Sequence, residues 1–282
     1  MTELTLDPTR PIGIFDSGVG GLSVLQAIRT ELPHENLFYL GDQGHVPYGP
    51  RPKDEIRDFA IGITRFLLNQ GAKEIVVACN TASAAALHDL RDLFPTVPLV
   101  GMEPAVKPAA EITQTGKVGV LATRNTFKGD LYASLVKRYG KDVQLFQSTC
   151  PGLVEQVEAG KIDTMETRTI LGNALKPMLE AGVDTIVLGC THYPFVTPVI
   201  REIIGNDKRI IDPSPAVARQ AKYLLSQRGL LNPKTDRGKT MYYTSGNSDT
   251  LKHQLNDLLG ETADVFQVKW RKDFSLRAKT LK

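Results

Sequence analysis

The sequence predicts an α/β fold, built from two pseudo-symmetric α/β domains with mainly parallel sheets and a cleft between them. Short apolar segments alternate with longer segments of helical periodicity, which is the pattern of parallel strands covered by helices on both faces. The segment 71–81 (GAKEIVVACNT) recurs in register as 182–192 (GVDTIVLGCTH), and 11–20 (PIGIFDSGVG) recurs as 117–126 (KVGVLATRNT). Two different strand ends are thus repeated in the same order, which indicates a duplicated unit.

Composition and charge are those of an ordinary globular protein. The 282 residues suffice for one large domain or two small ones, and the net charge of +3 is too small to indicate nucleic-acid binding. The basic residues within 269–282 are expected to form a solvated tail. No apolar run approaches the roughly 20 residues needed to cross a bilayer, and residues 1–10 do not follow the pattern of a signal peptide. Three cysteines, few and odd in number, indicate free thiols in a reduced, cytoplasmic protein.

The first repeated strand end leads into a turn rich in glycine. Residues 12–15 have the pattern of a buried strand, Asp16 and Ser17 follow it, and the glycines allow a tight turn into a helix at 22–32. The turn is not a P-loop, because no Gly-Lys-Ser/Thr follows, and it does not match the dinucleotide fingerprint in register. It is either a plain strand-to-helix turn or an anion-cradling turn with a carboxylate beside it.

A long loop follows the next predicted strand, at 36–41. Residues 42–52 (DQGHVPYGPRP) are rich in glycine and proline, and an irregular connection of this length at a strand end is typical of a site loop. Apolar residues at helical spacing then predict a helix at 53–69 with one face in the core. The first half also contains the strand that ends at Cys79, a helix at 82–94 and a strand at 97–101.

The second half and the C-terminal region continue this alternation of strands and helices. Besides the repeated strands that begin at 117 and 185, strands are predicted at 143–146, 209–211, 241–245 and 265–268. Helices are predicted at 128–139, 152–159, 166–181, 195–204, 216–228 and 249–259.

Polar side chains gather at the predicted carboxyl ends of the strands, where open parallel sheets bind their ligands. If the two units face each other, Cys79 and Cys190 approach one small ligand from opposite sides of the cleft. The side chains at these strand ends are Asp16, Ser17, Cys79, Asn80, Thr81, Thr123, Cys190, Thr191 and His192.

Two opposed thiols can exchange protons with the two faces of one carbon atom. The thiolate is the reactive form, and each cysteine precedes a predicted helix start, which is expected to lower the thiol pKa from about 8.5. One thiolate can then remove a proton while the opposite thiol returns one, which inverts a stereocentre. His192, two residues after Cys190, can assist proton movement there. The neighbouring hydroxyl and amide groups can hold carboxylate or amine groups of a substrate.

Other interpretations of these residues remain open. Cys79, Cys190 and His192 are three possible zinc ligands, but no CxxC or HExxH motif accompanies them. A Cys-His nucleophile is a second alternative, although it leaves one cysteine unexplained. A buried cysteine can also be a plain packing residue. That interpretation is preferred for Cys150, which has no counterpart in the repeat.

Four motifs make the chain resemble a known family. FDSGVGGL at 15–22, YLGD at 39–42 with PYG at 47–49, ACNTAS at 78–83 and LGCTHYP at 188–194 are those of the glutamate racemases, cofactor-independent members of the aspartate/glutamate racemase family. The resemblance covers about residues 11–268. It implies a two-domain α/β fold with an interdomain active site. It also implies interconversion of L- and D-glutamate without pyridoxal phosphate or metal, which supplies D-glutamate for peptidoglycan.

The resemblance also implies roles for individual residues. Cys79 and Cys190 would be the two acid/base thiols, assisted by Asp16 and His192 respectively. A further carboxylate is expected after the Cys-Pro pair, where the spacing to Gly160 favours Glu158 over Glu155. The expected substrate contacts are Asp16, Ser17, Tyr48, Gly49, Asn80, Thr81, Thr123, Thr191 and His192, with Thr126 as a further candidate.

The expected organisation follows from the repeat and the resemblance together. Residues 1–102 and 212–282 are assigned to one discontinuous domain and residues 103–211 to the second. The protein is expected to be a homodimer that uses no cofactor and no metal and has a small-molecule substrate as partner. Two alternatives are a related α-proton enzyme, such as an aspartate racemase, and a non-catalytic two-lobed amino-acid-binding protein. The presence of both cysteines argues against the first, and the missing export signal argues against the second.

Overall fold

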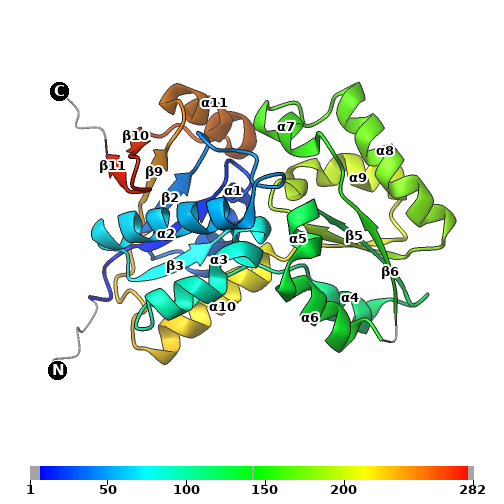
Figure 1. Cartoon of the computed structure of the whole chain (residues 1–282), viewed down its shortest axis with the longest axis horizontal. Coiled ribbons are helices and arrows are strands. Elements are labelled where there is room, and N and C mark those ends of the chain that lie inside the picture. The colour runs from blue at the N-terminus through cyan, green and yellow to red at the C-terminus, as the bar shows by residue number, and fades with distance from the viewer. Residues whose placement is uncertain (1–6, 142, 279–282) are drawn as a thin grey trace.

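The computed structural model describes residues 7–141 and 143–278 and shows two α/β units side by side (Figure 1). Each unit has its own sheet, with seven strands in one and four in the other. Every strand pair is parallel except the last one in the chain. The predicted fold class is therefore confirmed. No helix among the described residues is long and apolar enough to cross a membrane.

The larger sheet has the strand order β11-β10-β9-β2-β1-β3-β4, so the first strand lies in its middle. Strands β1 and β3 expose none of their residues, because helices cover both faces of the sheet. Its strands are β1 (Ile12–Asp16), β2 (Leu37–Gly41), β3 (Glu74–Val77), β4 (Leu99–Val100), β9 (Thr240–Thr244), β10 (Val265–Trp270) and β11 (Leu276–Ala278).

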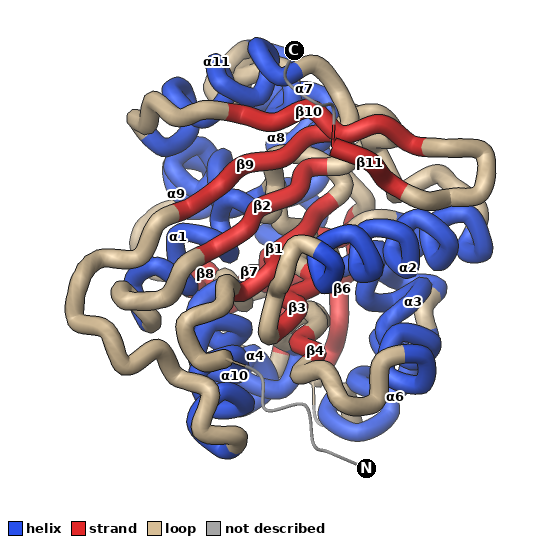
Figure 2. The backbone as a smooth tube through the Cα atoms, turned by 90° about the vertical axis from the view of Figure 1, so that its left-hand side faces the viewer, coloured by secondary structure: helices blue, strands red, loops and turns tan. Residues whose placement is uncertain are grey.

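Alternate residues of these strands pack into different cores. Ile12 and Ile14 belong to one hydrophobic cluster, whereas Phe15 belongs to a second on the opposite face. Figure 2 shows α2 and α3 on one side of this sheet and α1 and α10 on the other. The helices of this unit are α1 (Leu22–Glu31), α2 (Lys53–Asn69), α3 (Asn80–Leu93), α10 (Ser214–Gln227) and α11 (Ser248–Leu259).

The smaller sheet has the strand order β6-β5-β7-β8. Its strands are β5 (Lys117–Ala122), β6 (Gln144–Ser148), β7 (Thr185–Gly189) and β8 (Arg209–Ile211). Its helices are α4 (Val106–Ile112), α5 (Arg124–Lys128), α6 (Asp130–Tyr139), α7 (Leu153–Glu158), α8 (Met165–Glu180) and α9 (Thr197–Ile204), with a 3₁₀ turn at Tyr193–Val196.

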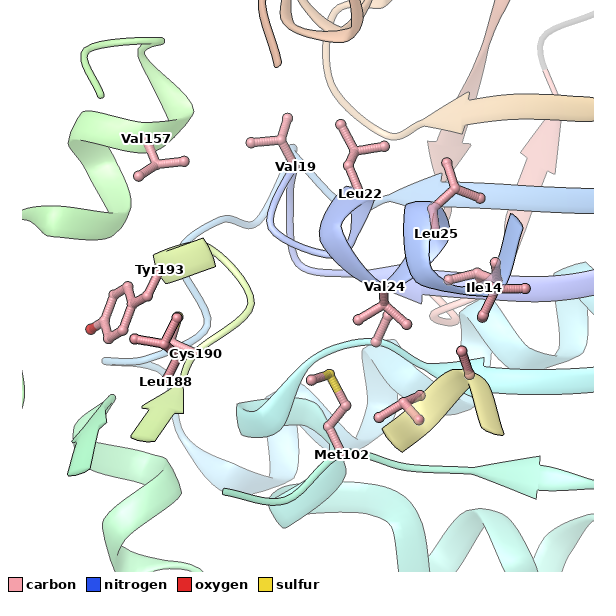
Figure 3. Packing of buried hydrophobic residues seen from close by; sticks show 14 of the residues in the cluster. Ile14, Val19, Leu22, Val24, Leu25, Met102, Val157, Leu188, Cys190 and Tyr193 are labelled. Atoms are coloured by element: carbon pink, nitrogen blue, oxygen red, sulfur yellow. The ribbon is translucent and has the colours of Figure 1, made fainter. Parts of the chain in front are cut away.

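One hydrophobic cluster runs from the first unit into the second (Figure 3). Leu22 and Met102 of the first unit share it with Val157, Leu188 and Tyr193 of the second. The continuous packing brings the carboxyl ends of β1 and β7 towards each other, and this positions the site described below.

The structure contains three elements that the sequence did not predict. Helix α4 was missed because Pro108 interrupts its helical pattern, yet a proline in the first turn leaves no backbone hydrogen bond broken. Helix α5 is a single short turn, and β11 lies in the segment expected to be a solvated tail.

The C-terminal segment is folded as far as it is described, so the expectation of a solvated tail was wrong for residues 269–278. Strand β11 pairs antiparallel with β10. The Trp270 ring lies 5.3 Å from the Phe59 ring of α2, and Phe274 lies 5.9 Å from the same ring. Strand pairing and the contact of the half-buried Trp270 ring with α2 therefore fix this segment, although its charged side chains and Phe274 stay exposed.

Gly62 is a residue of α2 against which the β10–β11 hairpin packs closely. A Cβ atom there would clash with the Phe274 carbonyl and the Trp270 ring. We expect Gly62→Ala to lower the free energy of unfolding in urea by about 1–3 kcal/mol, the usual range for overpacking.

Gly172→Ala in α8 is the matched control, because a Cβ there has no atom within 4 Å. This variant should gain up to about 1 kcal/mol from better helix propensity. Equal gains in both variants would show that the hairpin does not pack on α2 as described.

Candidate active site

A cavity of about 470 Å³ lies between the two units and contains both repeated cysteines. Those predicted residues that line it are Ser17, Tyr48, Gly49, Cys79, Asn80, Thr81, Thr123, Cys190, Thr191 and His192. The lining formed by the described residues does not include Asp16 or Glu158, which lie behind it. A larger cavity of about 660 Å³ lies around Met102 and Pro213, and its described lining contains no cysteine or histidine.

Cys79 forms the N-cap of α3, two residues after the end of β3. Its Sγ accepts a hydrogen bond from Ala82 N–H at 3.4 Å, which favours the thiolate. Burial outweighs this and raises the pKa of the Cys79 thiol well above its ordinary value, and the charge of Asp16 raises it further. The expectation of a lowered pKa is therefore wrong for Cys79 in the free protein, because desolvation is stronger than the helix terminus.

Asp16 lies at the end of β1 and is fully buried. Its carboxylate accepts hydrogen bonds from Gly18 N–H at 3.0 Å and from the Thr191 hydroxyl at 3.3 Å. Burial raises the pKa of Asp16, while nearby His192 opposes this shift. Asp16 is placed beside Cys79 rather than in the cavity wall, so in this structure it adjoins a thiol and not the ligand space.

Cys190, His192 and Glu158 form a hydrogen-bonded chain. The Cys190 Sγ lies 3.8 Å from His192 Nδ1, and His192 Nε2 lies 2.6 Å from Glu158 Oε1. Burial would lower the pKa of His192, but the hydrogen bonds with Cys190 and Glu158 raise it well above its ordinary value. Glu155 lines the cavity but is exposed, so Glu158 is the carboxylate that the structure brings onto His192.

The glycine turn after β1 contacts Glu158 and His192 of the other unit. Val19 N–H donates to Glu158 Oε1 at 2.8 Å. A Cβ at Gly18 would clash with the Glu158 carboxylate, and a Cβ at Gly20 would clash with the His192 ring. The turn therefore cradles an anion, as one of the two sequence interpretations held, and that anion is the protein's own carboxylate.

Hydroxyl and amide groups from both units meet at the cavity. The Thr81 hydroxyl lies 2.8 Å from the Thr123 hydroxyl, which in turn lies 3.0 Å from that of Thr126. The side-chain amide of Asn80 is buried, and both its polar atoms lack a hydrogen-bond partner among the described residues. Buried amides are normally satisfied, so Asn80 is poised to bind a polar ligand.

The loop after β2 carries Tyr48 and Gly49 to the cavity and is anchored by Asp42. The Tyr48 hydroxyl donates to Asp42 Oδ2 at 2.6 Å, so this hydroxyl is already engaged. Asp42 Oδ1 also accepts from the hydroxyl of Ser245 and, at 2.7 Å, from Trp270 Nε1–H. The C-terminal hairpin thereby fixes a loop of the site.

Several residues at the site were missed from the sequence. Asp42 lies in the YLGD motif, which was the available signal, but its partner Trp270 is distant in sequence and gave none. Two exposed cations, Arg124 and Lys128, line the cavity beside α5. No group of three His, Cys, Asp or Glu side chains in the described parts of the chain is arranged to hold a metal ion.

Comparison with known proteins agrees with this geometry. The sequence model of the Asp/Glu/hydantoin racemase family matches residues 13–221. A glutamate racemase of Stutzerimonas stutzeri is 48% identical over 92% of this chain and 97% of the relative. Among solved structures, glutamate racemase isoform RacE1 of Bacillus anthracis has a TM-score of 0.81 at 33% identity and covers 91% of this chain and 96% of that one. The Escherichia coli glutamate racemase, solved with L-glutamate and the activator UDP-MurNAc-Ala, has a TM-score of 0.80 at 32% identity, with 92% and 98% covered.

These similarities extend over both units and not only over the motifs at the cavity. The resemblance to glutamate racemases expected from the motifs is confirmed. The chain belongs to the Asp/Glu/hydantoin racemase family.

Proposed function

We propose that this protein interconverts L- and D-glutamate by proton transfer at Cα, without a cofactor. One observation carries the proposal: Cys79 from one unit and Cys190 from the other line the same cavity, and each has its own acid/base partner behind it. The glutamate racemases similar to this chain, one of them solved with L-glutamate, support this choice of substrate.

The proton balance uses both thiols in each turnover. The thiolate on one side takes the Cα proton, and the electron pair left on Cα is delocalised towards the substrate carboxylate. The thiol on the other side then gives its proton to the opposite face, so one cysteine ends protonated and the other ends as thiolate. Asp16 can exchange a proton with Cys79, and His192 can exchange one with Cys190, which resets the pair.

The polar lining provides for the charged groups of an amino acid. The unpartnered amide of Asn80 and the hydroxyls of Ser17 and Thr191 can hold the α-carboxylate and α-ammonium groups. Arg124 and Lys128 at the same cavity are cations that suit the side-chain carboxylate of glutamate.

The wider setting follows from the same proposal. D-glutamate would supply peptidoglycan synthesis in the cytoplasm, where free thiols persist. Residues 1–102 with 212–282, and residues 103–211, would be the two domains that enclose the substrate. A homodimer stays a prediction, which the mass of the protein in light scattering would test.

The direct test is circular dichroism of the purified protein with L-glutamate in D₂O, with a chelator and no added cofactor. The signal should decay to zero while deuterium appears at Cα. A folded protein that leaves both L-glutamate and L-aspartate unchanged would overturn the proposal. Turnover of L-aspartate alone would show that the protein is the alternative enzyme, an aspartate racemase.

The two-thiol mechanism makes a prediction about each cysteine. Cys79→Ser and Cys190→Ser should each lower kcat by about 10²–10⁴-fold, the usual effect of losing a general acid or base. Far-UV circular dichroism should remain unchanged. Cys150→Ser is the matched control, because this thiol lines the same cavity but lies beside Ser148 and Tyr193, which are not the carboxylate or imidazole that assist the other two thiols. Near-wild-type turnover in either of the first two variants would rule out the mechanism.

The ion pair between Glu158 and His192 predicts a pH-dependent stability. Burial would raise the pKa of Glu158, yet its hydrogen bonds, first that from His192, lower it below the ordinary 4.5, so this contribution is lost as the pH falls through the lowered value. The pKa of His192 is raised above 6.5, so its contribution is complete below pH 6.5 and is lost as the pH rises through the raised value.

We therefore expect Glu158→Gln to cost about 1–3 kcal/mol of unfolding free energy between roughly pH 5 and 6.5, and less at alkaline pH. Urea denaturation at several pH values measures this. Glu202→Gln removes an exposed partner of Arg168 and should change little at any pH. A cost for Glu158→Gln that grows with pH would contradict the assigned charges.

A further inference from the structure

Glu158 is held by the first unit although it belongs to the second. Its Oε1 accepts from Val19 N–H at 2.8 Å, and its Oε2 accepts from the side chain of Gln43 at 3.3 Å. Its backbone carbonyl accepts from the side chain of Gln254 at 2.6 Å. Two donors of the first unit thus fix the carboxylate that contacts His192, and a third fixes the backbone of the same residue.

Gln43 and Gln254 also fix each other. Gln43 Nε2 donates to Gln254 Oε1 at 2.7 Å, and Gln43 Oε1 accepts from the Thr244 hydroxyl at 2.9 Å. Every polar side-chain atom of the two amides is therefore engaged, and turning either amide over would oppose donor to donor or acceptor to acceptor. Gln254 is only 6% exposed, so water cannot easily replace these bonds.

We propose that Gln43 and Gln254, here called the glutamine pair, are positioning residues that hold Glu158 against His192 and thereby support proton transfer at Cys190. The proposal rests on the proposed function, in which Cys190 serves one face of Cα. The lining of the cavity by described residues includes neither glutamine, so they act through Glu158 and not on the substrate.

A neutral amide suits this task for an electrostatic reason. Its N–H groups favour the ionised form of Glu158, and the hydrogen bond from Gln43 helps to lower the pKa of that carboxylate. A cation in the same place would compete with His192 for the negative charge. The amide stabilises the carboxylate and leaves its charge available to His192.

The glutamine pair serves only one of the two thiols. Cys79 is adjoined by Asp16, whose carboxylate accepts hydrogen bonds from Gly18 N–H and the Thr191 hydroxyl and, within the described part of the chain, from neither glutamine. Loss of the pair should consequently impair proton transfer at Cys190 and spare that at Cys79. A merely structural defect would affect both sides alike.

The test uses Gln43→Met and Gln254→Met, which keep the length of the side chain and remove its hydrogen bonds. We expect kcat to fall by roughly 5–30-fold, the factor for one or two lost hydrogen bonds, with little change in KM. The kcat of the double variant should fall by about as much as that of one single variant, and not by the product of the two factors, because the pair acts as a unit. Gln227→Met, on the exposed end of α10, is the matched control and should behave as wild type.

Isotope effects with Cα-deuterated L- and D-glutamate show which thiol is affected. The substrate isotope effect on kcat/KM should rise in the direction in which Cys190 takes the deuteron and should not rise in the other. Equal changes in both directions, or a change in KM alone, would overturn the proposal. Unchanged kcat in folded variants would overturn it as well.

Titration of His192 by NMR separates this proposal from the proposed function. In both variants the pKa of His192 should fall, because Glu158 is held less firmly against it. An unchanged pKa of His192 would overturn the proposed role of the glutamine pair, even if the wild type racemises glutamate. If the wild type fails to racemise, the proposed function fails, while the titration still decides whether the pair positions Glu158.

Discussion

The hydrogen bond between Glu158 and His192 is the contact on which the site depends, because it organises one side of the cavity and its carboxylate also binds the first unit through Val19 N–H. It forms only because the turn after β1 lacks side chains at Gly18 and Gly20, where a Cβ would clash with Glu158 or with His192. The glycines whose sequence pattern predicts a plain or an anion-cradling turn therefore leave room for Glu158 and His192 of the second unit. The anion they receive is covalently part of the chain, which makes the cradle specific for one arrangement of the two units.

Burial acts differently on the two sides of the cavity. At Cys79 it outweighs the helix terminus, and with Asp16 it gives a neutral thiol beside a carboxyl whose pKa is raised. At His192 the partners outweigh burial, so the imidazole is charged and paired with Glu158. The same desolvation thus favours the neutral thiol at Cys79, whereas at His192 it is outweighed by an ion pair, and the difference lies in whether a charge of opposite sign is within hydrogen-bond reach.

The sequence could predict that Cys79 and Cys190 lie at equivalent strand ends, because the two strands that lead to them repeat in register and carry the continuous apolar run of a buried strand. The sequence could not predict the pKa of Cys79, since its desolvation is the summed effect of atoms from both units. Nor could it predict the hydrogen bonds from Trp270 to Asp42 and from Gln254 to Glu158. These partners are distant along the chain, belong to no repeat, and are brought together only by packing. Sequence patterns predict periodic elements such as strands and helices, whereas these two contacts follow no periodic pattern.

The duplication places the two thiols at equivalent strand ends, but it does not extend to the groups beside them. Both units supply a cysteine at the same strand end, but only the second sends a helix end, that of α7, across to the glycine turn of the first. Any opening that moves α7 away from this turn must remove the Val19 N–H and Gln43 donors from Glu158 together. The ion pair at His192 would then lose its fixed geometry. The position of α7 and the charge state beside Cys190 are consequently coupled by the same few hydrogen bonds, whereas Asp16, beside Cys79, accepts one bond from its own unit, from Gly18 N–H, and one from the other, from the Thr191 hydroxyl.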